Sequence, residues 1–412
     1  MTLTQDSFDY PQTRRVLVFS YAFPPMQIQM SPVVARALAG LKYQGFSVDV
    51  LTIKNFLPRI IASDESLMPY VRSCVDNLYY IPLDDTFSLW RSKYLKWTTS
   101  DIMGPLEQSA LKLLMSMDVE AYSAVMTFSP FHSINNVMLR VKQSNPKIRW
   151  IAHFCDPWAG NPLESNRLRQ IWNEWYEPKM LATVDFVTNS SKFTLEMMLR
   201  KHQNFDRSKA CVIPHFFDRE LYPKRPKAIN QKAKLRFVGT LFGRRTPKPL
   251  FEAVLNLLEH RLDLHGRFTI ELVGNIEESM LSNETVQSLP EGIIQHIPPV
   301  SYLKSLELMY DADILLLIEA DTDLNLFVPS KLADYMGADT PIVGIADSGG
   351  SRDILDSLGC WTATPNDIAN IERVLGNAID YVLNGCSSPW YNEEFKNSFS
   401  LQSVSKQLAD LI

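Results

Sequence analysis

Short apolar runs alternate with longer amphipathic stretches along almost the whole chain, and this alternation is interrupted only once. Apolar runs of this length are typical of buried parallel strands. The runs predicted as strands lie at residues 15–20, 48–53, 79–81, 124–128, 150–154, 186–188, 211–213, 235–239, 269–273, 293–296, 314–317, 342–344 and 360–362. The pattern predicts an α/β protein with helices packed against doubly wound parallel sheets.

Helical periodicity fills the intervals between these runs. Residues 105–117 are predicted as a helix whose apolar face consists of Leu106, Ala110, Leu113, Leu114 and Met117. Residues 192–201 are predicted as a helix with Ser190 or Ser191 as N-cap. Ser31 is the predicted N-cap of a helix that carries Arg36.

The interruption is a polar, basic, proline-containing segment around residues 222–234, which indicates a linker between two domains. A chain of 412 residues is also long for a single core. The predicted division is a first domain at 1–220, a linker at 221–234, a second domain at 235–388 and a helical tail at 389–412 that returns to the first domain. Open sheets of this kind bind ligands beyond the carboxyl ends of their strands, so two of them enclose a cleft.

Composition excludes several classes of protein. A net charge of −5 argues against a general nucleic-acid binder. The 5 cysteines are scattered without metal-ligand spacing, which favours reduced thiols in a cytoplasmic protein. The polar start at 1–11 does not resemble a secretory signal, and no apolar run is long enough for a membrane span. The apolar and basic patch at 56–61 is either a helix of the first domain or a contact with the inner face of the cell membrane.

Residues 328–344 combine a helix start with chemistry that suits an anion. Ser330 and Lys331 open the predicted helix, Asp334 follows one turn later, and the helix ends near Gly337. Backbone N–H groups at a helix N-terminus attract anions, and a lysine there strengthens the attraction. Asp334 lies on the same face and suits a ribose hydroxyl. The segment therefore predicts binding of a nucleotide or a phosphorylated sugar; the alternative is an ordinary helix with a charged first turn.

Two further strand ends in the second domain carry glycine. Gly239 and Thr240 precede a turn with three cations, and clustered cations suit a diphosphate; the alternative is a loop with surface charges. These cations are Arg244, Arg245 and Lys248. Gly274 ends the next strand. Val300 lies in a rigid loop and packs either on the base of a nucleotide or only on neighbouring side chains.

The first domain carries polar groups at three strand ends. They are Tyr21 before a Pro-Pro turn, Ser129 and His132 after a second strand, and His153 and Asp156 at a third. A histidine in a strand is more often structural than catalytic, but successive strand ends converge on one crevice.

Several segments together resemble GT-B-type retaining glycosyltransferases, in particular the family 4 enzymes of bacterial surface polysaccharide synthesis. Residues 15–25 look like the first strand and loop of that family. Residues 150–158 are similar to a motif written W-I-A-D-F-R-D-P-W, and residues 212–218 to V-I-P-N-G-F-D. Residues 237–240 and 328–343 resemble the donor-binding motifs.

The resemblance implies two Rossmann-like domains in the GT-B arrangement, with the acceptor side in the first and the nucleotide-sugar donor in the second. It assigns catalytic roles to His153, Asp156, Lys331 and Arg244. The donor side would comprise Gly239, Thr240, Arg245, Lys248, Gly274, Val300, Ser330 and Asp334, and the acceptor side Ser129, His132 and Tyr21.

The chain also departs from the family pattern. Many members have two glutamates eight positions apart, whereas here Asp334 takes the second position and Leu326 the first, with Asp321 or Asp323 as substitutes. The Gly-Gly after the first strand is replaced by the segment at 27–29.

The expected function is therefore transfer of a sugar from a nucleotide diphosphate donor to a saccharide or lipid-linked saccharide acceptor, without a metal ion or another cofactor. Two alternatives remain open: a nucleotide-sugar 2-epimerase of the same fold, and a non-catalytic nucleotide-sugar-binding paralogue. The sequence does not specify the oligomeric state.

Overall fold

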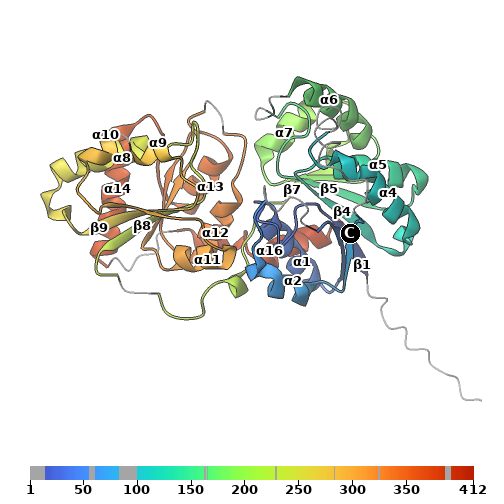
Figure 1. The fold of residues 1–412 in the computed structure, drawn as a ribbon, viewed down its shortest axis with the longest axis horizontal. Helices are drawn as coiled ribbons and strands as arrows, with labels where there is room; N and C mark the ends of the chain where they lie inside the picture. Colours follow the sequence, from blue (N-terminus) through green and yellow to red (C-terminus); the bar gives the residue numbers. More distant parts are fainter. Residues whose placement is uncertain are drawn as a thin grey trace, which may run out of the picture.

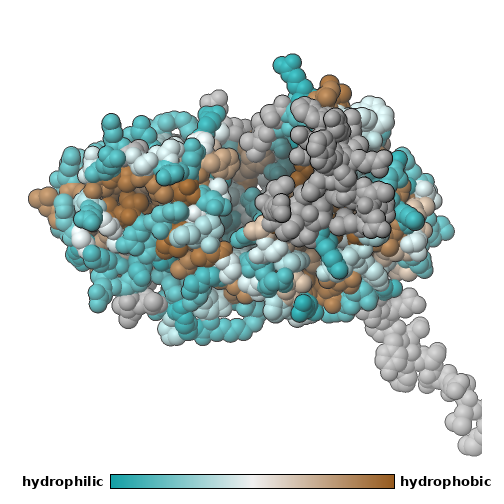
Figure 2. Space-filling view, viewed as in Figure 1, coloured by the Kyte–Doolittle hydropathy of each residue, from teal (hydrophilic) through white to brown (hydrophobic). Residues whose placement is uncertain are grey.

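The computed structural model describes residues 14–54, 61–82, 100–161, 164, 166–227, 230–282, 284–322, 325–385 and 391–412. The polar start at 1–11, residues 56–60 of the apolar patch and Asp323 lie outside the described residues. Two α/β halves stand side by side, each with helices around a central sheet (Figure 1). The visible face of the molecule is mostly hydrophilic, with smaller hydrophobic areas between the polar ones (Figure 2).

Seven strands form the first sheet in the described part of the chain, in the order β3-β2-β1-β4-β5-β6-β7. All pairings are parallel. Their bounds are β1 Arg15–Phe19, β2 Ser47–Thr52, β3 Asn77–Tyr80, β4 Ala124–Ser129, β5 Trp150–Phe154, β6 Phe186–Asn189 and β7 Ala210–Val212. The central strands are buried on both faces, which explains their continuous apolar runs.

The helices of the first domain connect these strands. Their bounds are α1 Ser31–Tyr43, α2 Met68–Cys74, α4 Glu107–Ser116, α5 Ser133–Ser144, α6 Arg167–Leu181 and α7 Lys192–Arg200. Ser191 caps α7 by accepting a hydrogen bond from the Thr194 N–H, as predicted. The prediction for Ser31 was wrong: it is the first residue of α1, and its hydroxyl donates to the Met26 carbonyl oxygen over 2.7 Å.

The second sheet contains six parallel strands among the residues described, in the order β10-β9-β8-β11-β12-β13. The strands are β8 Ala233–Val238, β9 Phe268–Val273, β10 Ile294–Ile297, β11 Ile314–Ile318, β12 Ile342–Ile345 and β13 Trp361–Ala363. The helices are α8 Lys248–His260, α9 Glu278–Leu281, α10 Glu284–Ser288, α11 Tyr302–Tyr310, α12 Ser330–Ala338, α13 Gly350–Leu358 and α14 Ile368–Leu383. This second parallel α/β layer confirms the predicted fold class.

The C-terminal tail returns to the first domain. It forms α15 Glu393–Asn397 and α16 Leu401–Ala409. Apolar residues of α16, among them Leu401, Val404 and Leu408, share a core cluster with α1. The two helices approach so closely that a Cβ added at Gly40 would lie 3.0 Å from Ser405 Cβ. The predicted return of the final helix is confirmed.

In the part of the chain that the structure describes, no helix combines the length and apolar character needed to cross a bilayer. Short 3-10 helices complete the secondary structure, at Glu65–Leu67, Gly104–Leu106, Val119–Ala121, Arg207–Lys209, Arg219–Leu221 and Leu262–Leu264.

Candidate active site between the two domains

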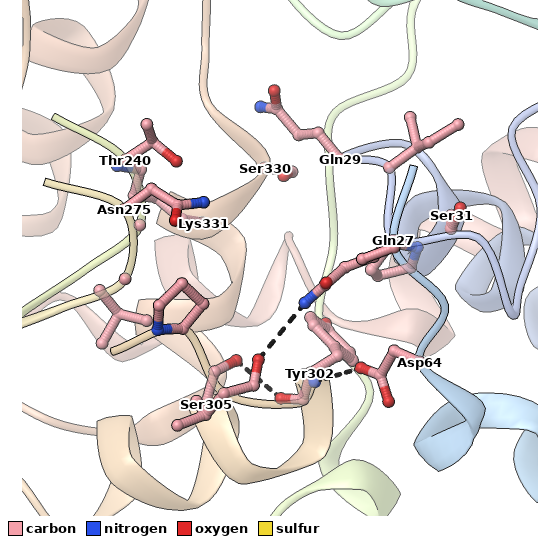
Figure 3. Close-up of a pocket in the computed structure, with 18 of the residues that line it drawn as sticks. Gln27, Gln29, Ser31, Asp64, Thr240, Asn275, Tyr302, Ser305, Ser330 and Lys331 are labelled. Atoms are coloured by element: carbon pink, nitrogen blue, oxygen red, sulfur yellow. Dashed lines mark hydrogen bonds between the residues drawn. The ribbon is translucent and has the colours of Figure 1, made fainter. Parts of the chain in front are cut away.

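A cavity of about 710 Å³ lies between the two domains, which is a volume typical of small-molecule sites. Its walls come from loops that follow strands of both sheets, together with the start of α12. Polar side chains from the two domains face each other across it (Figure 3). The predicted donor-side residues in its walls are Gly239, Thr240, Arg245, Gly274, Val300, Ser330, Lys331 and Asp334.

Two glycines make the second-domain wall possible. Gly239 and Gly274 have φ of 144° and 123°, a region that side chains with a Cβ rarely adopt. A Cβ at Gly274 would lie 2.0 Å from the Gly239 carbonyl oxygen, and one at Gly239 would lie 2.9 Å from Lys331 Nζ. Glycine at both positions therefore allows two strand-end loops to touch and leaves room for the lysine ammonium.

Lys331 is a buried cation in the cavity wall. Its Nζ lies 4.4 Å from the centroid of the Phe237 ring and has no hydrogen-bond partner among the described residues. Burial lowers the pKa of Lys331 to about 8, and Arg245 lowers it as well, whereas Glu319 and Asp334 raise it. A buried charge without a hydrogen-bond partner is unfavourable, so this arrangement favours an anionic ligand.

Of the three cations predicted for a diphosphate, the structure brings one into the cavity wall. Arg245 lines the cavity, and its Nη2 donates to Glu319 Oε2 over 2.9 Å. Arg244 is exposed and is not part of the wall. Lys248 begins α8, also outside the wall, with its Nζ 3.7 Å from Glu252 Oε1.

Asp334, the predicted ribose partner, takes part in an ion pair between the domains. Its carboxylate accepts from the guanidinium of Arg36 on α1 and from the Tyr302 hydroxyl, the latter over 2.9 Å. The Tyr222 hydroxyl donates to the Asp334 carbonyl oxygen over 2.8 Å. Both charged side chains are buried, so this pair holds α12 against α1 and limits how Asp334 can meet a ligand.

Further hydrogen bonds cross the cleft near the cavity. The Tyr302 N–H donates to Asp64 Oδ2 over 2.5 Å, and Gln27 Nε2 donates to the Val300 carbonyl oxygen over 3.4 Å (Figure 3). Ser191 Oγ and Thr194 Oγ1 both donate to the Leu326 carbonyl oxygen, over 2.5 and 2.9 Å. These contacts join the two domains.

The predicted first-domain residues do not line the cavity, and all of them except the half-buried Asp156 lie in the interior of that domain. His132 stacks on Phe154 and Trp158, and burial lowers its pKa to about 3. His153 Nδ1 lies 2.8 Å from Thr188 Oγ1, and burial lowers the pKa of His153 to about 4. Both rings are therefore neutral at pH 7.

The remaining first-domain candidates are also outside the wall. Ser129 Oγ donates to the His153 carbonyl oxygen over 3.2 Å. The Tyr21 side chain is fully buried, and burial raises the pKa of Asp156. The three strands β1, β4 and β5 are neighbours in the sheet, but none of these side chains lines the cavity.

Comparisons with solved structures identify the architecture. HepE from Anabaena, in complex with UDP and glucose, superposes with a TM-score of 0.65 at 10% identity, over 96% of this chain and 98% of HepE. A glycosyltransferase from Rickettsia africae gives 0.64 at 12% identity, over 97% and 98%. Sucrose-phosphate synthase from Thermosynechococcus elongatus gives 0.62 at 14%, over 97% and 98%.

The chain has the GT-B fold. The match extends over nearly the full length of both chains, and two parallel sheets with a returning C-terminal helix account for it. No protein-family model matches the sequence, and no curated protein matches it.

Within the GT-B cleft, the position of the absent first acid has a different role. The Leu326 carbonyl oxygen is the acceptor for two first-domain hydroxyls, as described above. Asp321, one of the two expected substitutes, accepts from Asn366 Nδ2 over 3.1 Å and is not part of the cavity wall. The described residues contain no group of three or more His, Cys, Asp or Glu side chains suited to a metal ion.

Sequence reasoning missed several groups that shape the GT-B cleft. Asp64 and Asn275 line the cavity without belonging to any recognised motif. Glu319 directly follows β11 and binds Arg245 behind the wall. An acid placed directly after a buried strand is a signal that could have identified Glu319, because such positions lie at the carboxyl edge of the sheet.

Proposed function

We propose that the chain is a glycosyltransferase that moves a sugar from a nucleotide diphosphate donor to a saccharide or lipid-linked saccharide acceptor, with retained anomeric configuration. We place it in bacterial cell-surface polysaccharide biosynthesis. The observation that carries the proposal is the buried Lys331 ammonium, which has no hydrogen-bond partner among the described residues and lies beside Arg245 in an interdomain cavity. The GT-B fold supports it, as do the UDP and UDP-glucose in the similar HepE structures.

The proposed chemistry follows from these charges. Breaking the bond between the sugar and the diphosphate passes through an oxocarbenium-like state, and negative charge grows on the leaving diphosphate. Lys331, Arg245 and the N–H groups at the start of α12 would stabilise that charge more strongly in the transition state than in the ground state. The departing phosphate oxygen would itself take the acceptor proton. We infer that no metal ion is required, since Lys331 and Arg245 would supply the positive charge beside the diphosphate.

A binding screen tests the donor site. Thermal shift and calorimetry with UDP-, GDP-, ADP- and dTDP-sugars, each without and with EDTA, should show one nucleotide series that binds in both conditions. NMR of the product with a saccharide acceptor should then show the anomeric configuration of the donor. Absence of binding by every series would contradict the proposal, and loss of binding in EDTA would contradict metal independence.

A non-catalytic nucleotide-sugar-binding protein is the second candidate. It is favoured by the first-domain side of the cleft, where His132 and His153 are buried away from the cavity, and by the ion pair that occupies Asp334. This candidate predicts donor binding with neither transfer nor donor hydrolysis.

An epimerase of the same fold requires carboxylates around the sugar. Among the described residues of the cavity wall the acids are Asp64 and Asp334, and both accept hydrogen bonds from Tyr302. NMR of the donor incubated alone separates this alternative, because an epimerase converts the sugar without an acceptor.

We place the protein in the cytoplasm, with peripheral contact at the inner face of the membrane for a lipid-linked acceptor. Co-flotation with anionic liposomes is the expected result. Recovery of all the protein in the dense fraction would contradict membrane contact.

A further inference from the structure

Glu319 is a buried carboxylate behind the wall of the cavity. It directly follows β11, and its side chain is 2% exposed. Oε2 accepts from Arg245 Nη2 over 2.9 Å and from Asn325 Nδ2 over 3.4 Å. Oε1 is buried and has no hydrogen-bond partner among the described residues. No sequence motif includes this residue.

Glu319 acts on the two cations of the cavity wall. Arg245 and Lys331 both line the cavity, and the charges that act on Lys331 are those of Arg245, Glu319 and Asp334. Two cations held next to each other repel, and a carboxylate between or behind them reduces that repulsion. The Arg245 side chain is 28% exposed, so a buried acceptor is needed to hold its guanidinium in one orientation.

We propose that Glu319 is the positioning residue for the anion-binding cations of the cleft: it holds the Arg245 guanidinium in the cavity wall and offsets the repulsion between Arg245 and Lys331. This role rests on the proposed function, because it names the residue that arranges both cations for the donor diphosphate. A purely structural ion pair is the competing explanation.

The same sheet contains a matched structural pair. Arg236 on β8 and Glu271 on β9 form a buried ion pair, and neither residue lines the cavity. Glu271→Gln therefore removes a buried carboxylate of the same domain without touching the cations of the cleft. It reports what the loss of a buried pair does to stability alone.

The pH dependence of anion binding separates positioning from structure. Burial leaves the pKa of Lys331 at about 8, and Glu319 is one of the groups that raise it. Anion binding favours the ammonium form, so affinity should fall as the pH rises through about 8. Removing the charge of Glu319 lowers the pKa of Lys331 further and moves that fall to lower pH. Removing the charge of Arg245 moves it to higher pH.

The experiment is calorimetric titration of the full chain with UDP and, separately, with inorganic pyrophosphate between pH 6.5 and 9.5. Glu319→Gln keeps an oxygen for Arg245, so its affinity at pH 6.5 should stay within roughly threefold of wild type while the midpoint of the fall moves down. Glu319→Ala also loses the anchor and should bind roughly tenfold more weakly at every pH. Arg245→Gln, on the partly exposed side of the pair, should move the midpoint up.

The results divide clearly. Glu271→Gln is expected to lower the thermal midpoint and leave the affinity and its pH dependence unchanged. The positioning role is overturned if the pH midpoint of the fall in affinity does not move in Glu319→Gln, or if it moves equally in Glu271→Gln. Should the Glu319 variants fail to fold, the positioning role is overturned if the pH midpoint of the fall in affinity does not move in Arg245→Gln. Pyrophosphate binding without any nucleotide binding contradicts the proposed function but leaves the Glu319 test intact, whereas absence of both contradicts both. Protonation of the ligand phosphates affects all variants equally, so it does not change the difference between a variant and wild type.

Discussion

The two domains present different chemistry at the carboxyl edges of their sheets. The second domain contributes Arg245 and the buried ammonium of Lys331 to the cavity wall. The first domain holds His132 and His153 in its interior, where burial keeps both rings neutral. The same topology therefore builds one edge with free positive charge and one edge in which polar groups are already paired or stacked.

Under the proposed function, this difference gives recognition of the donor anion to the second domain. The first domain contributes neutral or acidic groups from loops, chiefly Gln27 and Asp64, which bond across the cleft. Arg36 reaches from the first domain into the second and is buried there with Asp334. Substitutions on the two sides of the cleft test this contrast, and the largest effect is expected at the ion pair between the domains.

The ion pair between the domains should produce the largest change. Arg36→Ala leaves the buried Asp334 carboxylate without its cation, and breaking such a pair costs about 3–5 kcal/mol of stability. Urea unfolding measures the loss. Lys42→Ala on the same helix breaks the exposed pair with Asp76 and should cost less than about 1 kcal/mol. Equal losses in the two variants would show that Arg36 does not hold the domains together.

Lys331→Ala tests the positively charged wall that the second domain contributes to the cavity. Removing one preorganised cation should raise the barrier to transfer by about 2–4 kcal/mol, which lowers the turnover number roughly 30- to 1000-fold. Steady-state kinetics measures the change, and circular dichroism checks that the variant is folded. Near-normal turnover in a folded variant would remove Lys331 from the mechanism.

The stability contributed by the buried His153 of the first domain should depend on pH. Burial lowers the pKa of His153 to about 4 in the folded protein, whereas in the unfolded chain the pKa is near its ordinary value of 6.5. The unfolded state therefore binds more protons below pH 6.5, so stability is lost as the pH falls, by about 2 kcal/mol between pH 6.5 and 5.

His153→Asn keeps a polar atom near Thr188 and cannot titrate in this range. Urea midpoints of wild type and variant, measured from pH 7 to 5, should therefore converge as the pH falls. Parallel curves would mean that folding does not lower the pKa of His153, and the contrast between the edges would weaken.

The smallest effects should come from the cations outside the cavity. Arg244→Ala and Lys248→Ala remove exposed charges, and surface charges contribute little, so turnover should change less than about threefold. Kinetics under the conditions used for Lys331→Ala makes the comparison. A loss as large as that of Lys331→Ala would return these two residues to the diphosphate site predicted from the sequence.

Local sequence patterns predicted the secondary structure closely. The strand at 150–154 has the bounds predicted for it, and that at 186–188 extends by one residue to Asn189. Such runs are readable because burial on both faces requires continuous apolar residues. Ser31 was not predicted correctly from the local sequence. Its hydroxyl donates to the carbonyl oxygen of Met26, a contact that the Ser-Pro pair alone does not specify.

The site was predictable only in part. Glycines at strand ends and a lysine at a helix start pointed to the second-domain wall, and Gly239, Gly274 and Lys331 do line the cavity. The sequence could not distinguish Arg245 from its neighbour Arg244, because the choice depends on the buried acceptor Glu319, which lies 74 positions away.

The order of strands and helices, and with it the two parallel sheets, could be predicted from the amino-acid sequence. Those features follow from short-range periodicity, which is present in consecutive residues. Which charges remain unpaired depends on the tertiary structure. Asp334 is bound by Arg36 from 298 positions away, while Lys331, three residues before Asp334 on the same helix, has no hydrogen-bond partner among the described residues. Electrostatic pairing depends on distance in space, and folding brings distant residues together.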